Sequence, residues 1–289
     1  WSSRMSRPSY VLKASCTDTV GIVAAVTGFL AARGALITEM AHFVDDEAQK
    51  SFIRVEFEDD AESGEDLGEM SASFKSTVSK TFGMRFAFHP SGRKMRTLIA
   101  VSKQSHCINA LLHRWWDGHL PIEITGIVSN HEEQRDLASW YELPFHHFPI
   151  ESGKKPAQEA RILALFEETG SELLVLARYM QILSPHLCES LAGRTINIHH
   201  SFLPAFAGAK PYHAAFERGV KIIGATSHYV TEELDEGPII AQDVTPVSHI
   251  HSIADFIAKG RDLEKMVLAR AVRRVRRSGY VETISLWGG

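Results

Sequence analysis

Residues 97–130 decide the fold of the larger part of this chain. They contain the apolar run TLIAVSK (97–103), the helix-like segment INALLHRWWDG (108–118) and a second apolar run, IEITGIVSN (122–130). Short apolar runs of this kind are typical of strands that are buried on both faces. The alternation continues with ARILALFEETG (160–170) as a helix, SELLVLARYM (171–180) as a strand and INIHHS (196–201) as a strand that runs into a loop. Strands that alternate with helices predict an α/β fold with a doubly wound, mostly parallel, Rossmann-like sheet.

The N-terminal part shows a different order of elements. YVLKASC (10–16), ALITEMAHFVD (35–45), QKSFIRVEFE (49–58) and MRFAFH (84–89) are typical of strands, and residues 18–34 and 65–83 are typical of helices. The order βαββαβ predicts a ferredoxin-like domain over residues 8–89. Residues 90–96, PSGRKMR, break the periodicity and are expected to form a linker, so that residues 97–289 form a second domain.

Composition limits the classes of function. The 289 residues are 44% hydrophobic and 23% charged, as in ordinary globular proteins. The net charge of -4 argues against nucleic acid as a partner, and no apolar run has the length of a membrane span. A basic face on the helix expected over residues 261–277, whose apolar side carries Leu263, Met266, Val267, Ala271 and Val275, is more often a solvated face than an RNA-binding one.

Three cysteines, Cys16, Cys107 and Cys188, lie far apart and predict neither a disulfide framework nor a zinc site. Together with the lack of a signal-peptide core, they favour the cytoplasm. Met5 is a candidate natural start, in which case Trp1–Arg4 would not be native.

Polar side chains gather where two expected strands end. INIHHSFLP (196–204) contributes Asn197 and His199, and LDEG (234–237), after the strand-like ATSHYV (225–230), contributes Asp235. Ligands of doubly wound sheets bind at the carboxyl ends of the strands. An amide, an imidazole and a carboxylate suit acyl transfer without a metal. Taken singly, each residue is more often structural: an Asn that bonds nearby backbone, a core His, an Asp in a turn.

In acyl transfer, each of the three residue types has a role. The Asn197 amide can donate to a developing oxyanion, which is worth about 3 kcal/mol. His199 can stabilise that charge and relay protons. Asp235 can orient an attacking water and take its proton if burial raises the pKa of its carboxyl group.

The segment from Asn197 to Gln242 resembles the 10-formyltetrahydrofolate formyltransferase family, whose signature has Asn-Ile-His, Ser, Leu-Pro and a distal Asp and Gly in this order. The resemblance implies that Asn197, His199 and Asp235 are catalytic. It implies that folate binds to two segments, which contribute Met180, Gln181, Ile182 and Leu183, and Thr231, Glu232, Glu233 and Leu234. His200 replaces a proline that is usual in related transferases. His228 either tunes the site or is a hydrogen-bonded core histidine, and His213 is expected to be structural.

The formyl acceptor is predicted from absences. The purine-pathway transferases of this family bind a nucleotide phosphate with a glycine-rich loop, where this chain has SKQSHC (102–107) without glycine, although Lys103 could still attract an anion. Few residues follow the last predicted helix, whereas the tRNA branch has a further domain. Water is therefore the expected acceptor, and over nearly its full length the chain resembles the formyltetrahydrofolate deformylase family. The alternatives are a phosphoribosylglycinamide formyltransferase and a non-catalytic amino-acid sensor.

The deformylase resemblance implies that the products are formate, used in purine synthesis and one-carbon balance, and tetrahydrofolate, and that no metal or cofactor is needed. The turn at residues 18–23, DTVGIV, looks like the signature of the ACT domain, an amino-acid-sensing module. Asp18, Val20 and Gly21 are the candidate effector-binding residues; the alternative is that Asp18 only caps the helix and Gly21 only packs. ACT-like domains commonly pair across a two-fold axis, so a homo-oligomer is expected.

Overall fold

The computed structural model describes residues 7–59, 66–151, 153–205 and 211–278. Trp1–Arg4 and Glu65, where one helix is expected to begin, lie outside these ranges. The chain forms two compact units, Trp1–Arg93 and Lys94–Gly289. Among the described helices, none combines the length and the apolar character that crossing a lipid bilayer requires.

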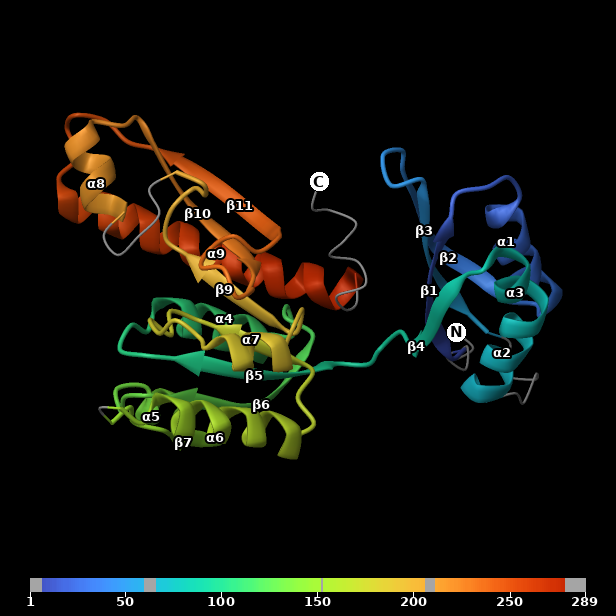
Figure 1. Ribbon diagram of the computed structural model, residues 1–289, viewed down its shortest axis with the longest axis horizontal. Helices are drawn as coiled ribbons and strands as arrows, with labels where there is room; N and C mark the ends of the chain where they lie inside the picture. The colour runs from blue at the N-terminus through green and yellow to red at the C-terminus, as the bar shows by residue number, and fades with distance from the viewer. Residues whose placement is uncertain (1–6, 60–65, 152, 206–210, 279–289) are drawn as a thin grey trace, which may run out of the picture. The chain divides into compact units, whose positions relative to one another are not determined.

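The first unit is an antiparallel sheet with helices on one side (Figure 1). Its elements are β1 (Ser9–Thr17), α1 (Ile22–Ala32), β2 (Leu36–Asp45), β3 (Lys50–Glu58), α2 (Leu67–Phe74), a π-helical turn (Lys75–Ser79), α3 (Lys80–Phe82) and β4 (Arg85–Pro90). The strand order β2-β3-β1-β4 is that of the ferredoxin-like arrangement, and this part of the predicted fold class is confirmed.

The second unit contains a seven-stranded sheet of order β11-β10-β9-β8-β5-β6-β7. Its elements are β5 (Met95–Val101), α4 (His106–Trp116), β6 (Ile122–Ser129), α5 (Arg135–Trp140), β7 (Phe145–His147), α6 (Lys155–Glu168), β8 (Leu173–Leu176), α7 (Pro185–Ser190), β9 (Thr195–His199), α8 (Pro211–Arg218), β10 (Ile222–Tyr229), β11 (Ile239–Pro246) and α9 (Ile253–Ser278). Strands β5 to β9 pair in parallel, whereas β10 and β11 are antiparallel. The predicted mostly parallel sheet is confirmed.

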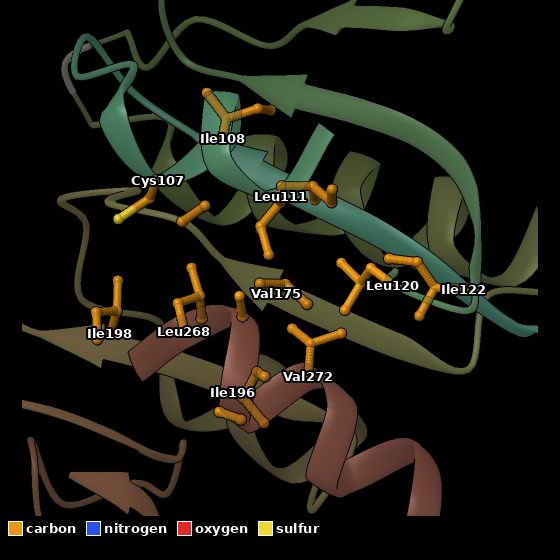
Figure 2. Packing of buried hydrophobic residues seen from close by; sticks show 14 of the residues in the cluster. Cys107, Ile108, Leu111, Leu120, Ile122, Val175, Ile196, Ile198, Leu268 and Val272 are labelled. Atoms are coloured by element: carbon orange, nitrogen blue, oxygen red, sulfur yellow. The ribbon is translucent and has the colours of Figure 1, made fainter. Parts of the chain in front are cut away.

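Both faces of this sheet are covered. Successive residues of β5 point to opposite sides, so that Leu98 packs with α6 and α7 while Ile99 packs with α4 and α9. Figure 2 shows the second of these cores, in which Leu268 and Val272 of α9 face Val175 of β8. The apolar run at residues 97–101 is explained by this two-sided burial.

The structure differs from the sequence prediction at several places. The strand expected over residues 171–180 ends at Leu176, because Arg178 and Met180 have φ angles of 63° and 54° that a strand does not allow. The last helix begins at Ile253, eight residues before the expected start. Met266 is 44% exposed and is not on the buried side of that helix, where Leu268 and Val272 lie instead.

Candidate active site

The pairing of β9 with β10 brings Asn197 and His228, two residues of the predicted site, together. β9 and β10 pair so that His228 lies opposite Asn197 and Thr226 lies opposite His199. Asn197 Nδ2 is 3.4 Å from His228 Nε2. The register of β10 against β11 shifts between Ser227 and His228, and an irregularity of this kind re-aims a side chain. His228 is only 3% exposed, but its contact with Asn197 places it at the site rather than in a separate core.

The loop after β10 places the carboxylate. Gly237 lies so close to the strand that a Cβ atom on it would overlap the carbonyl oxygen of Tyr229, and the amide of Tyr229 donates to the carbonyl of Pro238 at 2.9 Å. Only glycine allows this approach, which folds the loop back onto β10. Asp235 has a φ angle of 61°, in the left-handed region that Asp adopts more readily than most residues, and its side chain is 11% exposed.

Asp235 lies between two imidazoles. Its Oδ2 is 3.1 Å from His199 Nδ1, and its Oδ1 is 3.5 Å from His228 Nε2. His228 Nδ1 donates to the carbonyl of Tyr229 at 2.8 Å, a bond that sets its tautomer. The Nε2 atom of a neutral His228 can therefore accept from Asn197, and that of a protonated His228 can donate to Asp235. The Nε2 atom of His199 is buried and has no hydrogen-bond partner among the described residues.

Two opposing effects act on the pKa of the Asp235 carboxyl group. Burial raises this pKa, but hydrogen bonds and positive charge from His199 and His228 lower it by more, so the pKa falls well below its ordinary value. The condition under which Asp235 could take the proton of the water, a carboxyl pKa raised by burial, is therefore not met. The physical reason is the pair of imidazoles, which favour the charged form. Asp235 is an ionised acceptor rather than a proton donor at neutral pH.

A cavity of about 50 Å³ opens beside these groups. Both predicted folate-binding segments line it, together with three residues of the polar group. The lining residues are Leu176, Gln181, Ile182, Leu183, Cys188, Asn197, His228, Val230, Thr231, Glu232, Glu233, Leu234 and Asp235. Leu183 is buried, whereas Ile182 is 59% exposed and is not a core residue. Met180, 53% exposed, is not on the lining, and neither is His199.

His200 and the N-terminal candidates lie elsewhere. His200 is buried beside His199, with ring centroids 5.2 Å apart, and does not line the cavity. Gly21, with a φ angle of 94°, is the N-cap of α1 in the first unit, and no side chain caps this helix, so Asp18 is not its cap. Val20 is 97% exposed. These three residues belong to a different unit from the cavity.

One group of polar residues behind the site was missed by the sequence analysis. Glu264 of α9, 1% exposed, accepts hydrogen bonds from Tyr212 Oη at 2.7 Å and from His106 Nε2 at 2.8 Å. Its Oε2 is also 3.4 Å from Nε of Arg178. A sequence signal existed: Glu264 lies one turn before Leu268, within the apolar stripe of the helix, where a carboxylate needs partners.

The second unit, which contains the cavity and its polar residues, is similar to proteins of known class. A family model described as formyl transferase matches residues 95–272, which contain the whole cavity and its polar group. A crystal structure of glycinamide ribonucleotide transformylase 1 from Symbiobacterium toebii is similar with a TM-score of 0.62 and 27% identity; the match covers 66% of this chain and 91% of that one. The second unit is thus a formyl transferase fold.

More similar relatives cover both units. A formyltetrahydrofolate deformylase of Corynebacterium sp. (strain P-1) is 51% identical over 264 residues, which are 91% of this chain and 92% of that protein. A crystal structure of a formyltetrahydrofolate deformylase from Pseudomonas syringae pv. tomato has a TM-score of 0.89 and 43% identity; the match covers 95% of this chain and 91% of that one. The chain belongs to the formyltetrahydrofolate deformylase family.

Proposed function

We propose that this protein hydrolyses 10-formyltetrahydrofolate to formate and tetrahydrofolate. The observation that carries the proposal is the linked group Asn197, His228, Asp235 and His199 beside a cavity lined by both predicted folate segments. Family membership supports the same activity, because the relatives that match both units are named formyltetrahydrofolate deformylases.

The geometry supports a division of roles during hydrolysis. A water molecule attacks the formyl carbon, and the developing oxyanion accepts a hydrogen bond from the Asn197 amide. With Nδ1–H of His199 donated to Asp235, its buried Nε2 is an acceptor and takes the proton of the water. The resulting imidazolium is stabilised by the ionised Asp235 and returns the proton to the leaving N10 nitrogen. Asp235 thus acts mainly by orienting His199 and His228.

The loop segments supply the folate contacts in this proposal. The pterin lies against the backbone of residues 181–183 on one side and residues 231–235 on the other, as the cavity lining supports. The carbonyl of Ile182 also accepts a hydrogen bond from Lys155 Nζ, which holds this segment to α6. Met180 lies outside the lining and is left without a contact role.

We propose that the reaction uses no metal ion or cofactor, because each step above has an assigned side chain. His106, Cys107 and Glu264 place one candidate ligand atom each within 4.8 Å of one another, but the guanidinium of Arg178 lies beside the same carboxylate and opposes a cation there. Turnover after dialysis against a chelator should equal turnover before it. A loss that zinc or another divalent ion restored would contradict the proposal.

Three expectations, on an amino-acid effector, on the oligomeric state and on the compartment, are proposals. We propose that the first unit binds an amino acid near Gly21 and joins copies of the chain into a homo-oligomer, on the support of its ferredoxin-like fold. We propose the cytoplasm as compartment, because Cys16, Cys107 and Cys188 are unpaired and buried, which suits a reducing environment.

Formate release from 10-formyltetrahydrofolate, measured with and without glycinamide ribonucleotide, tests the activity. Steady release without the nucleotide is the expected result. Turnover only with the nucleotide would instead favour a phosphoribosylglycinamide formyltransferase, and no turnover in either case would favour a non-catalytic sensor. The lower identity of the transformylase structure, 27% against 51% for the deformylase relative, supports the first outcome.

A further inference from the structure

Glu264 is the centre of a buried polar cluster that the proposed chemistry does not use. Its two carboxylate oxygens bind different partners: Oε1 accepts from Tyr212, and Oε2 accepts from His106 and faces Arg178. Burial raises the pKa of Glu264, but the hydrogen bond from His106 and the charge of Arg178 lower it by more. The carboxylate is therefore ionised at neutral pH and holds its partners firmly.

One side of the cluster leads to the catalytic imidazole. The ring of Tyr212 packs edge-on against that of His200, with centroids 5.8 Å apart and planes at 64°. His200 in turn lies 5.2 Å from the ring of His199. Both distances lie in the range of favourable ring contacts. Since Asp235 bonds His199 Nδ1, the imidazole is held by a carboxylate on one side and by this stack on the other.

The other side of the cluster contacts Arg178, which precedes the expected folate-binding residues 181–183. Arg178 is 7% exposed and lies in the segment between β8 and the cavity. Both Arg178 and Met180 have left-handed backbone conformations. Such a backbone persists only where its surroundings hold it. The Arg178 guanidinium faces Glu264, and the carbonyl of the neighbouring Tyr179 accepts a hydrogen bond from Ser102. These contacts set the direction in which residues 181–183 leave the sheet.

Gly260 lets the cluster form. A Cβ atom at this position would overlap the ring of Tyr212. Glycine inside a helix is less stable than alanine there, so its presence within α9 requires a reason. The close approach of Tyr212 to the helix one turn before Glu264 supplies it.

We propose that Glu264 is a positioning residue for the formyl reaction: it sets the place of His199 through Tyr212 and His200, and the place of the folate loop, residues 181–183, through Arg178. This inference rests on the proposed hydrolysis. It predicts that changes on the Tyr212 side of the cluster lower turnover, whereas changes on the Arg178 side weaken folate binding.

Four variants distinguish the Tyr212 side of the cluster from the Arg178 side. Tyr212→Phe keeps the ring and removes the hydroxyl, and Gly260→Ala displaces the ring without changing a charge. Both should lower kcat about tenfold, since small displacements of a catalytic group cost this much or more, and should leave the Kd of a non-hydrolysable folate analogue within about twofold. Arg178→Met should instead raise that Kd about tenfold, and Arg178→Lys should restore most of the binding.

A control variant and two folding measurements distinguish loss of positioning from loss of folded structure. Gly28→Ala adds the same methyl group to α1, where no atom lies within 4 Å, and should leave kcat and Kd at the parent values. Circular dichroism and melting temperature show whether each variant is folded. Combining Tyr212→Phe with Gly260→Ala should give a loss smaller than the product of the two single losses, because both act through one ring.

The outcomes are distinguishable. Folded variants whose kcat and Kd all stay within about twofold of the parent, or a double variant whose losses multiply, would overturn the positioning role. If Tyr212→Phe does not fold, the split between Gly260→Ala and Arg178→Met decides the question. Parent protein that binds the folate analogue but releases no formate would overturn the proposed hydrolysis, and with it this inference.

Discussion

Asp235 is the residue on which the proposed chemistry depends most, because its two oxygens face two different imidazoles. The 3.1 Å contact with His199 is short enough for a hydrogen bond, whereas the 3.5 Å separation from His228 is at the limit. His228 has a second fixed partner in the Tyr229 carbonyl, while His199 has none at Nε2 among the described residues. The free nitrogen therefore belongs to His199, and we assign the proton transfer to it.

Replacement of this carboxylate should separate turnover from binding. Asp235→Asn keeps the size of the side chain but removes the charge that stabilises the His199 imidazolium. We expect kcat to fall on the order of 10³-fold, with the Kd of a folate analogue nearly unchanged. The matched control is Asp243→Asn, which alters an Asp of β11 that forms an ion pair with Arg270 of α9. This variant should retain parent turnover. Near-parent turnover of Asp235→Asn would remove Asp235 from the mechanism.

Asn197 should show a smaller effect. Its amide is the proposed donor to the oxyanion, and loss of one such donor in other enzymes costs about 10² to 10³ in kcat. Asn197→Ala should therefore lower kcat by about this factor at saturating substrate. An increase in KM with unchanged kcat would instead mean that Asn197 contributes to substrate binding equally in the ground and transition states.

The titration of Asp235 gives a direct test of the geometry. Its pKa is lowered from the ordinary 3.8 because two imidazoles outweigh burial. Removing either imidazole leaves the burial in place, so His199→Ala and His228→Ala should each raise the pKa of Asp235. Carbon-13 NMR of labelled Asp carboxyl groups, with Asp235→Asn to assign the signal, measures this. A pKa that stayed unchanged in both variants would contradict the observed contacts.

At the scale of elements, the loop between β10 and β11 depends on Gly237. A Cβ there would overlap the Tyr229 carbonyl, so Gly237→Ala should push residues 231–235 away from β10. Because these residues line the cavity and include Asp235, we expect KM to rise and kcat to fall, each about tenfold. Gly92→Ala, with no atom within 4 Å of the added methyl, is the control and should match the parent in steady-state kinetics.

The sequence was sufficient for the main strands and for part of the site. The strands around residues 97–101 and 122–129 are apolar runs buried on both faces, a pattern that few other elements produce. Asn197 and His199 are two residues apart and so share one face of β9. Their meeting with Asp235 is predicted by the family resemblance over residues 197–242; strand ends alone do not bring the residues together, because β10 runs antiparallel to β9.

Other features depend on contacts distant in sequence. The three residues of β7 are too few to show a period, and the antiparallel direction of β10 is set by its pairing with β9 rather than by its own residues. Glu264 meets His106 across 158 positions, a contact that no local pattern encodes. The lowered pKa of Asp235 likewise follows from its contacts with His199 and then His228, which the register of β9 against β10 brings to one site.

For the whole molecule, the first unit raises the question of regulation. We expect an amino acid that binds near Gly21 to change both turnover and melting temperature, since binding to the folded state alone stabilises it. Titration with single amino acids, glycine and methionine first, tests this. If neither turnover nor melting temperature changes with any amino acid, the proposed effector role of the first unit is wrong.

Acid stability should be governed by the second unit. Asp235 and Glu264 both lie there, and both have pKa values lowered relative to their ordinary 3.8 and 4.5. A group with a lowered pKa in the folded state stabilises that state above its unfolded pKa, and the stabilisation is lost as the pH falls through the folded value. The free energy of unfolding should therefore decrease as the pH falls below about 4.5.

Removing one of these titrating groups should weaken the pH dependence. Glu264→Gln cannot gain a proton on unfolding, so its free energy of unfolding should fall less than that of the parent between pH 7 and pH 3.5. Chemical denaturation at both pH values measures the difference, and Glu167→Gln, which alters an exposed glutamate on α6, should behave as the parent does. An equal fall in Glu264→Gln and parent would mean that the His106 and Arg178 contacts do not lower the pKa of Glu264.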